Sequence, residues 1–318
     1  MKSIELLAPA KDLQAAVAAV DYGADALYIG GARFGARHAA GNSAEEIARA
    51  VEYAHQYGVR VHATLNTLLY DGELAEAERQ ARELIAAGVD ALILADLGAF
   101  TLAGKYAPRC QRHISTQQSI ANYACAQAWF DLGAQRVVLA RELSRRDIHT
   151  ITRDCPAEIE VFGHGALCMC YSGQCEMSAV IGGRSGNRGL CAQPCRLDWR
   201  CGKGDHVLSL KDMSLLRHAQ EMADAGITTF KIEGRMKRPE YVAAVVTACR
   251  EALTGEAYDE DTLRAVFSRS GFTDGYLTGK RDKTMFGYRT KDDVQSADKV
   301  LKSLAALYEK LSLIHISE

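Results

Sequence analysis

The residues best suited to metal chemistry are cysteines gathered in one stretch of the chain. Six of the ten cysteines fall within 34 residues, between Cys168 and Cys201. The spacing C-x6-C-x15-C-x3-C, interleaved with glycines, joins four of them: Cys168, Cys175, Cys191 and Cys195. Four converging thiolates satisfy either tetrahedral zinc or a [4Fe–4S] cluster, and glycines let backbone wrap closely around such a centre.

The spacing favours the larger cluster over zinc. Structural zinc sites usually have short C-x2-4-C pairs on both sides, whereas only the second pair is short here. Zinc stays open as the alternative, as do cysteines that act only as small buried apolar residues. Cys170 and Cys201 are left over, and Cys170 is the residue that most readily replaces one of the four. We expect the scattered cysteines to be bystanders: Cys110, Cys125, Cys155 and Cys249.

A repeated phrase predicts the elements that position these residues. A helix-like run, a glycine, two or three residues and an apolar strand recur five times, with the glycine at Gly23, Gly58, Gly88, Gly133 and Gly226. Each glycine suits a left-handed helix C-cap. Further strands near residues 5–7, 112–115 and 158–162 bring the count to eight. Eight strands alternating with helices predict a (β/α)8 TIM-like barrel, with a doubly wound open sheet as the competing fold.

Helix starts and a long loop divide the chain. Ser43 with Glu46, and Ser144 with Asp147, have capping-box spacing. The excursion from Gly163 to Asp205, after the seventh strand, is far longer than an ordinary βα loop. We therefore predict a barrel over residues 1–256, which includes a Cys-rich insertion at 164–207, and a post-barrel segment over 257–318.

Polar side chains follow the predicted strands. In a barrel, chemistry occurs where strands end and βα loops begin, so these residues are the candidate site. The candidates for catalysis are His164, Lys231, Glu233 and Arg235. The candidates for substrate binding are Arg37, His38, Asn66, Gln117, Arg141 and Arg188. Arginine and lysine suit phosphate or carboxylate, and Glu233 or His164 suits proton transfer.

Composition limits the class of protein. With 318 residues, 48% hydrophobic, 25% charged and 5 prolines, the chain predicts a globular protein with a large core. No leader-like run opens it and no apolar run is long enough to span a membrane, so we expect a cytoplasmic protein without a membrane partner. The net charge of −2 excludes uniform coating of nucleic acid, but basic stretches at 184–203 and 231–238 allow a local RNA-binding face.

Several motifs resemble those of a known family. The stretch EVFGHGALC at 160–168, continued by YSGQC at 171–175, resembles the signature of peptidase family U32, the collagenase-like proteases. Supporting matches lie at 5–10, 23–30, 139–143 and 231–235, so that the resemblance covers residues 4 to about 290. Residues 31–38 and 187–196 look most like the branch that hydroxylates a cytidine of 23S ribosomal RNA.

The resemblance implies a function that spacing alone does not. It implies a [4Fe–4S] cluster on Cys168, Cys175, Cys191 and Cys195, and hydroxylation of RNA without oxygen. It further suggests a chorismate-pathway metabolite such as prephenate as co-substrate, and an unidentified redox partner. Sister branches act on transfer RNA or on the ubiquinone ring.

Two other functions stay open. The chain has no H-E-x-x-H zinc helix and no G-x-S-x-G elbow, so a peptidase would need Cys168 and His164 as a dyad. A cysteine bound to a cluster cannot serve as nucleophile, so these two readings exclude each other at Cys168. The other alternative is an RNA-binding module in which the metal is purely structural.

The end of the sequence suggests truncation. Residues 311–318 read LSLIHISE and, when they are reverse-translated with ordinary codons, match a sequencing-library adapter. We therefore expect the gene fragment to run into adapter sequence near Lys310. The stretch 267–277 resembles the family's post-barrel segment, of which only the beginning would then be present.

Overall fold

Eight parallel strands close into a barrel in this computed structural model, which describes the backbone of residues 4–315 and the side chains of residues 4–295 and 297–306. The last barrel strand pairs in parallel with both the first strand and the seventh, so the sheet has no open edge at this point. Closure confirms the predicted barrel and rules out the doubly wound sheet. The strands are β1 (Glu5–Ala10), β2 (Ala26–Gly31), β4 (Arg60–Leu65), β5 (Ala91–Leu94), β6 (Gln111–Ile114), β7 (Arg136–Val138), β8 (Glu158–Gly165) and β10 (Thr229–Ile232).

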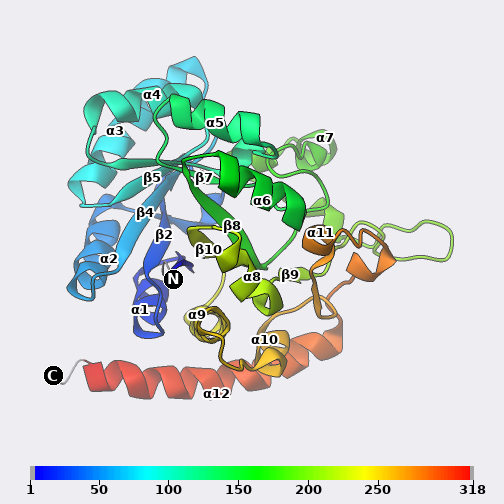
Figure 1. Cartoon of the computed structure of the whole chain (residues 1–318). Helices are drawn as coiled ribbons and strands as arrows, with labels where there is room; N and C mark the ends of the chain where they lie inside the picture. The colour runs from blue at the N-terminus through cyan, green and yellow to red at the C-terminus, as the bar shows by residue number, and fades with distance from the viewer. Residues whose placement is uncertain (1–3, 316–318) are drawn as a thin grey trace.

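Helices surround the strands (Figure 1). Both predicted capping boxes are present: the Ser43 and Ser144 hydroxyls accept from the backbone of Glu46 and Asp147, whose carboxylates accept from the serine N–H groups. Alanine-rich inner faces bring the helices close to the apolar outer face of the sheet, where the main core lies. The helices are α1 (Leu13–Asp21), α2 (Ala44–Gln56), α3 (Leu74–Ala86), α4 (Leu97–Tyr106), α5 (Tyr123–Asp131), α6 (Arg145–Asp154), α8 (Ala219–Asp224) and α9 (Pro239–Thr254).

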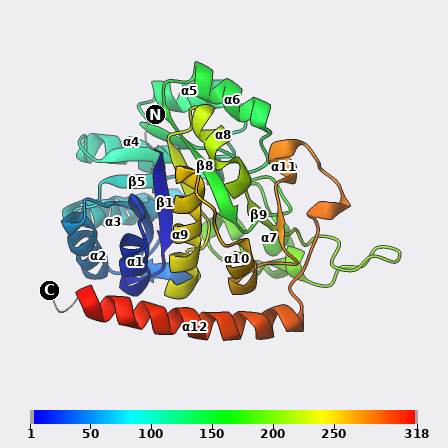
Figure 2. The same ribbon diagram turned by 60° about the horizontal axis from the view of Figure 1, so that its bottom comes forward.

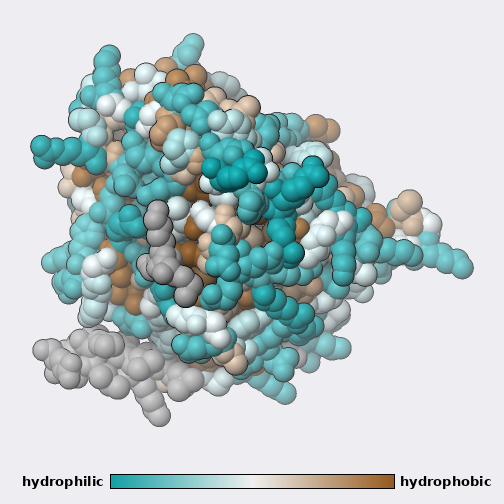
Figure 3. All heavy atoms as spheres, viewed as in Figure 1, coloured by the Kyte–Doolittle hydropathy of each residue, from teal (hydrophilic) through white to brown (hydrophobic). Residues whose placement is uncertain are grey.

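The insertion and the post-barrel segment form one addition to the barrel. Strand β9 (Asp212–Ser214), at the end of the insertion, runs antiparallel to β8, and β11 (Phe272–Thr273) pairs with β9 in parallel. The insertion also contains α7 (Met177–Gly182) and a hairpin bridged between Cys201 and Gly204, which projects from the barrel in Figure 1 and as an arm in Figure 3. The post-barrel segment thus completes a sheet that the insertion begins.

A long helix closes the described chain. The post-barrel segment contains α10 (Glu260–Val266), α11 (Gly275–Thr278) and α12 (Lys291–His315), and Figure 2 shows α12 running beneath α9 and α10. Ala297 is buried there, with Val300 and Leu304 packed against the core. The predicted division at residue 256 stays a prediction, although α9 ends at Thr254. The predicted adapter-derived residues, 311–318, fall outside the described side chains. No described helix is long and apolar enough to cross a bilayer.

Charged side chains fill the lower interior of the barrel. Arg136, 1% exposed, lies 2.5 Å from a carboxylate oxygen of Glu5, 2.7 Å from one of Glu158 and 3.3 Å from one of Glu160. Burial opposes the charge of Arg136, but Glu160 and Glu5 outweigh it and raise the pKa of the guanidinium. These ion pairs link β1, β7 and β8 across the barrel.

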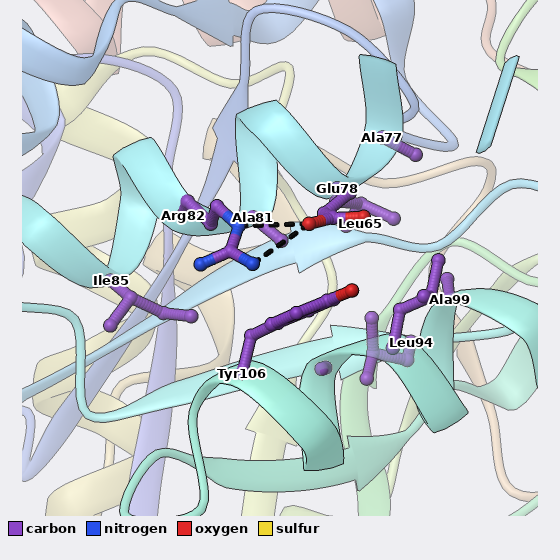
Figure 4. Close-up of a pocket in the computed structure, with 11 residues that line it drawn as sticks. Leu65, Ala77, Glu78, Ala81, Arg82, Ile85, Leu94, Ala99 and Tyr106 are labelled. Carbon is purple, nitrogen blue, oxygen red and sulfur yellow. Dashed lines mark hydrogen bonds and ion pairs between the residues drawn. The ribbon is translucent and has the colours of Figure 1, made fainter. Parts of the chain in front are cut away.

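One apolar hollow lies away from the barrel mouth. Figure 4 shows it between α3, α4 and the underlying strands, lined by Ala77, Ala81 and Ile85 among others. At its edge Arg82 stacks 3.7 Å from the centre of the Tyr106 ring and donates to Glu78 at 2.8 Å. Small alanine side chains at the interface of helix and sheet explain the gap, and no predicted site residue lines it.

Candidate functional site

A buried carboxylate lies among three guanidinium groups at the carboxyl ends of the strands. Glu233 follows β10 directly and is 3.0 Å from an Nη of Arg141, which follows β7, and 3.4 Å from one of Arg37, which follows β2. Arg235, 3% exposed, donates to the Thr64 hydroxyl on β4. Because strand ends meet at one face of a barrel, residues far apart in sequence converge here.

The positive charge at this mouth exceeds the negative charge. Burial opposes ionisation of Glu233, but Arg37, Arg141 and Arg235 outweigh it and hold the pKa of the carboxyl below its usual range. Burial, aided by Arg37, lowers the pKa of Arg235 to about 10. The Nε atoms of Arg141 and Arg235 are buried and have no hydrogen-bond partner among the described residues. An additional anion would supply both the missing charge and the missing acceptors.

Aromatic rings form the floor beneath these charges. The Arg141 guanidinium stacks 3.8 Å from the centre of the Phe162 ring, and Lys231 lies 4.4 Å from that of Tyr28. The Tyr28 hydroxyl donates to the carbonyl oxygen of Ile232 at 2.8 Å. Tyr28 and Phe162 are only 5% and 6% exposed, so the cations lie over the rings and the rings stabilise them from below.

Lys231 lies below the mouth, inside the barrel. Its ammonium donates to Glu160 at 2.5 Å, and both side chains are buried. Burial lowers the pKa of Lys231, although Glu160 opposes this effect. The structure therefore places the predicted catalytic lysine in an interior ion pair, and its catalytic role stays a prediction.

The Cys-rich insertion is attached over the mouth at several points. Gly173, at φ +76°, lies against the Gln117 backbone carbonyl with no room for a Cβ atom. The Ser172 hydroxyl accepts from the backbone N–H of Arg141 at 3.2 Å and donates to Glu142 at 2.9 Å. These contacts join the insertion to the loops after β6 and β7.

The other side of the insertion is joined to loops from the first half of the barrel. The backbone N–H of His38 donates to the Gly189 carbonyl at 3.3 Å. Arg188 pairs with Glu73, donating at 3.1 Å, and stacks 4.6 Å from the Tyr70 ring. The predicted binding residues His38, Gln117 and Arg188 thus hold the insertion in place, two of them through backbone groups.

Two of the predicted ligand cysteines, Cys168 and Cys191, affect the pKa of a third, Cys195. Burial chiefly raises the pKa of Cys195, Arg196 opposes this, and Cys168 and Cys191 add to it. Gly186 lies close to both Cys175 and Cys191. A Cβ atom at Gly186 would be 3.6 Å from the Cβ of Cys191 and 3.8 Å from the carbonyl oxygen of Cys175.

The sulfur atoms of the cysteines are not drawn tightly together in the described part of the chain. Tetrahedral zinc with Zn–S bonds of about 2.3 Å needs sulfur atoms roughly 3.8 Å apart. Within the described part of the chain, no three cysteine sulfurs lie within 4.8 Å of one another. All of these donors are thiols, the soft ligands that zinc and iron–sulfur sites share. Cys170 stays an alternative ligand because it lies near Cys175. Burial raises the pKa of the Cys170 thiol, and Cys175 raises it further.

His164 lies apart from the arginines. Its ring packs 5.1 Å from that of Phe272 on β11, and its Nδ1 atom is buried without a hydrogen-bond partner. Burial lowers the pKa of His164 to about 4, so it is neutral at pH 7. The side chain of Asn66 forms hydrogen bonds within the protein. Its amide oxygen accepts from the backbone N–H of Ala36 at 2.9 Å, and its amide nitrogen donates to the Ser115 hydroxyl at 3.0 Å.

The structure gathers four of the predicted residues at the mouth: Arg37, Arg141, Glu233 and Arg235. The sequence prediction missed the aromatic floor of Tyr28 and Phe162 and the attachment by Ser172. A signal existed for the floor, because alternate residues of a barrel strand face inward and Phe162 is two residues from the inward Glu160.

Comparison with known proteins identifies the family. Residues 11–286 match the model of peptidase family U32. The chain belongs to this family. Its U32 relatives include a 23S rRNA 5-hydroxycytidine synthase of Escherichia coli, 42% identical over 88% of this chain and 44% of that protein. A Bacillus subtilis tRNA hydroxylation protein P1 is 39% identical over 82% of this chain and 66% of its own length.

Other U32 relatives have names of a different kind. A protein named collagenase from Porphyromonas gingivalis is 36% identical over 88% of this chain and 75% of its own length. The solved structure of the U32 peptidase Mk0906 is 15% identical, with a TM-score of 0.43 over 52% of this chain and 69% of that one. The chain spans less than half of the Escherichia coli relative and about two thirds of the Bacillus subtilis one.

Proposed function

We propose that this U32 protein is an iron–sulfur-dependent RNA hydroxylase that acts on a cytidine-like base of 23S rRNA without molecular oxygen. One observation carries the proposal: the Cys-rich insertion is attached over a buried, cation-rich mouth. Arg37 connects the two parts. Glu233 raises the pKa of Arg37 against the effect of burial, and the thiols of Cys168 and Cys191 add to this increase.

The residues at the mouth have distinct roles in this proposal. Arg141 and Arg235 bind an anionic co-substrate, a carboxylate such as prephenate, through their unpaired Nε donors. Glu233 holds Arg37 and Arg141 in position. The base, turned out of its stack as chemistry on a base requires, enters the mouth beside these cations.

The cysteines provide the redox part. Cys168, Cys175, Cys191 and Cys195 would hold a [4Fe–4S] cluster at the edge of the mouth. Such a cluster supplies electron transfer or Lewis acidity to the bound substrate. The insertion closes over the mouth, so it also limits the access of water to the reacting groups.

The names of two relatives support RNA as substrate, since both refer to RNA hydroxylation. The collagenase name of another relative favours a peptidase instead. The surroundings of His164 argue against its dyad with Cys168, because its ring packs against Phe272 and its Nδ1 has no partner to orient it.

The experiment is an absorbance spectrum with iron and sulfide assays on protein purified without oxygen, alongside mass spectrometry of rRNA nucleosides after incubation. We expect wild type to show broad visible absorbance, with about four irons per chain for a [4Fe–4S] cluster. Cys191→Ala should lose both the absorbance and hydroxylation. Cys201→Ala, on the exposed hairpin, is the matched control and should keep both.

Three outcomes would contradict the proposal in different ways. A colourless protein that contains zinc would replace the cluster by a single ion. Identical spectra for wild type and Cys191→Ala would remove Cys191 from the ligand set. An intact cluster without any hydroxylated cytidine would leave an RNA-binding module with a structural metal.

A further inference from the structure

A second group of cations lies beside the mouth, around the ring of Phe267. The Lys237 ammonium is 2.7 Å from the ring centre, and the guanidinium carbons of Arg289 and Arg269 are 4.7 and 5.0 Å from it. Lys237 comes from the loop between β10 and α9, whereas the other residues belong to the post-barrel segment. We call Lys237, Phe267, Arg269 and Arg289 the Phe267 cluster.

The Phe267 cluster has more positive charge than its surroundings balance. Asp212 pairs with Arg269 at 2.5 Å and accepts from its backbone N–H at 3.0 Å. Lys237 and Arg289 are half-buried, and neither side chain forms an ion pair or a hydrogen bond with any described residue. The Nε of Arg289 is shielded from water and has no acceptor. Unpaired, partly desolvated cations are unfavourable unless an anion joins them.

Electrostatics at Lys237 agree with this geometry. Burial lowers the pKa of Lys237 to about 7; Asp212 and, more weakly, Glu233 oppose the shift, while Arg269 and Arg289 reinforce it. Near pH 7.5 much of the lysine is therefore neutral in the free protein. A bound anion would favour the charged form and draw in a proton.

We propose that the Phe267 cluster binds a phosphodiester of the substrate RNA, next to the nucleotide whose base enters the mouth. This proposal rests on the proposed function, which makes the polymer RNA. Lys237 lies on the same loop as Glu233 and Arg235, and a Cβ atom on Gly234 would be 3.4 Å from its Cγ, so the cluster borders the mouth. A phosphate held there would fix the register of the strand, while the mouth receives the base.

The chemistry of the Phe267 cluster suits a phosphate. The planar guanidinium of Arg289 can donate two parallel hydrogen bonds to phosphate oxygens, and the Lys237 ammonium adds a point charge. The Phe267 ring itself packs against the core, so the cations lie on the side chain that anchors them to the fold.

The first test measures RNA binding across a series of salt concentrations. Fluorescence anisotropy with a short, labelled single-stranded RNA is compared between wild type, Lys237→Gln and Arg289→Gln. Each lost phosphate contact should reduce the slope of log K against log salt by about 0.7 and weaken binding several-fold at low salt. Arg49→Gln, at an exposed position on α2, is the control and should match wild type.

Two further measurements protect this test from a folding artefact. Thermal unfolding checks that each variant is folded, and Arg289→Lys, which keeps the charge, should retain most of the salt slope. Unchanged affinity and slope in folded Lys237→Gln and Arg289→Gln would overturn the Phe267 cluster as a phosphate site. RNA hydroxylation by wild type would still stand in that case.

The second test uses tripolyphosphate alone. Calorimetry near pH 7.5 in two buffers of different ionisation heat should show net proton uptake by wild type, which is absent in Lys237→Gln. Tripolyphosphate binding without any RNA binding would overturn the RNA assignment here and the substrate in the proposed function together. Absence of tripolyphosphate binding would overturn the anion site itself.

Discussion

At the scale of single residues, Glu233 decides how the mouth holds its charges. It is the carboxylate shared by Arg37 and Arg141, and its own side chain is 14% exposed. Three guanidinium groups in such a small volume repel one another without it. An entering anion would share this role with Glu233, so the free mouth is already arranged for negative charge.

Glu233→Gln should destabilise the fold at neutral pH by about 3 kcal/mol, because it leaves buried arginines without their counter-charge. The folded-state pKa of Glu233 is lowered, so its stabilisation is complete above the unfolded pKa of roughly 4.3 and is lost as pH falls through the folded value. The difference between variant and wild type should therefore shrink below about pH 4. Urea unfolding across this range measures it.

Glu83→Gln is the control for this prediction, because the Glu83 side chain is 54% exposed and its carboxylate comes no closer than 3.9 Å to Arg79, a weak ion pair. It should change the free energy of unfolding by less than about 0.5 kcal/mol. If Glu233→Gln cost no more than the control, or cost the same at every pH, the arginines would not depend on the Glu233 charge.

At the scale of elements, Gly173 sets how closely the Cys-rich insertion approaches the barrel. Gly173→Ala would place a Cβ against the Gln117 carbonyl and should displace the insertion, while the barrel beneath stays folded. We expect loss of visible absorbance and iron with a melting temperature only slightly lowered. Spectra and iron content, measured beside thermal unfolding, test this.

Gly183→Ala separates the clash from backbone strain. Gly183 also has a positive φ, +65°, but a Cβ there meets no atom within 4 Å. Both variants therefore carry a strained backbone, and only Gly173→Ala carries a steric conflict. Equal loss of iron in the two variants would mean that backbone strain, rather than the contact between Gly173 and the Gln117 carbonyl, causes the effect.

Local sequence predicted the framework because each signal lay within one βα unit. The glycine at a helix C-cap and the apolar run after it predicted β2, β4, β5, β7 and β10, and with them the place of Glu233 and Arg235 just past a strand end. The contact between Lys231 and Glu160 inside the barrel depends on the register of β10 against β8, in which Lys231 lies opposite Phe162. No local pattern specifies that alignment.

The position of His164 was beyond prediction for a similar reason. Its neighbour, Phe272, lies on β11 of the post-barrel segment, which reaches β8 only through β9 of the insertion. The predicted cysteine set depended on spacing and resemblance, and the choice between Cys170 and its neighbours needs the folded loop. Long-range pairing, rather than local preference, decided these features.

At the scale of the whole molecule, one arginine links the two strands that flank β10, the strand that closes the barrel. Arg136, on β7, pairs with Glu5 on β1 and with Glu160 on β8, while β10 closes the ring between those two strands. These residues are within the barrel interior, where charged groups lose their hydration. They are stable there only as a matched set.

Arg136→Leu should therefore lower the free energy of unfolding by about 3–5 kcal/mol, because the buried carboxylate of Glu5 loses one of the cations that balance its charge. Arg153→Leu is the control: Arg153 is 62% exposed and, among the described residues, pairs only with Asp154 on its own helix. Its substitution should cost less than about 0.5 kcal/mol. Urea unfolding of both variants at pH 7 measures the difference. Because a buried glutamate that has lost one of its cations regains stability when protonated, the penalty for Arg136→Leu should also fall in acid. A penalty equal to that of Arg153→Leu would mean that backbone pairing and apolar packing close the barrel without help from its interior charges.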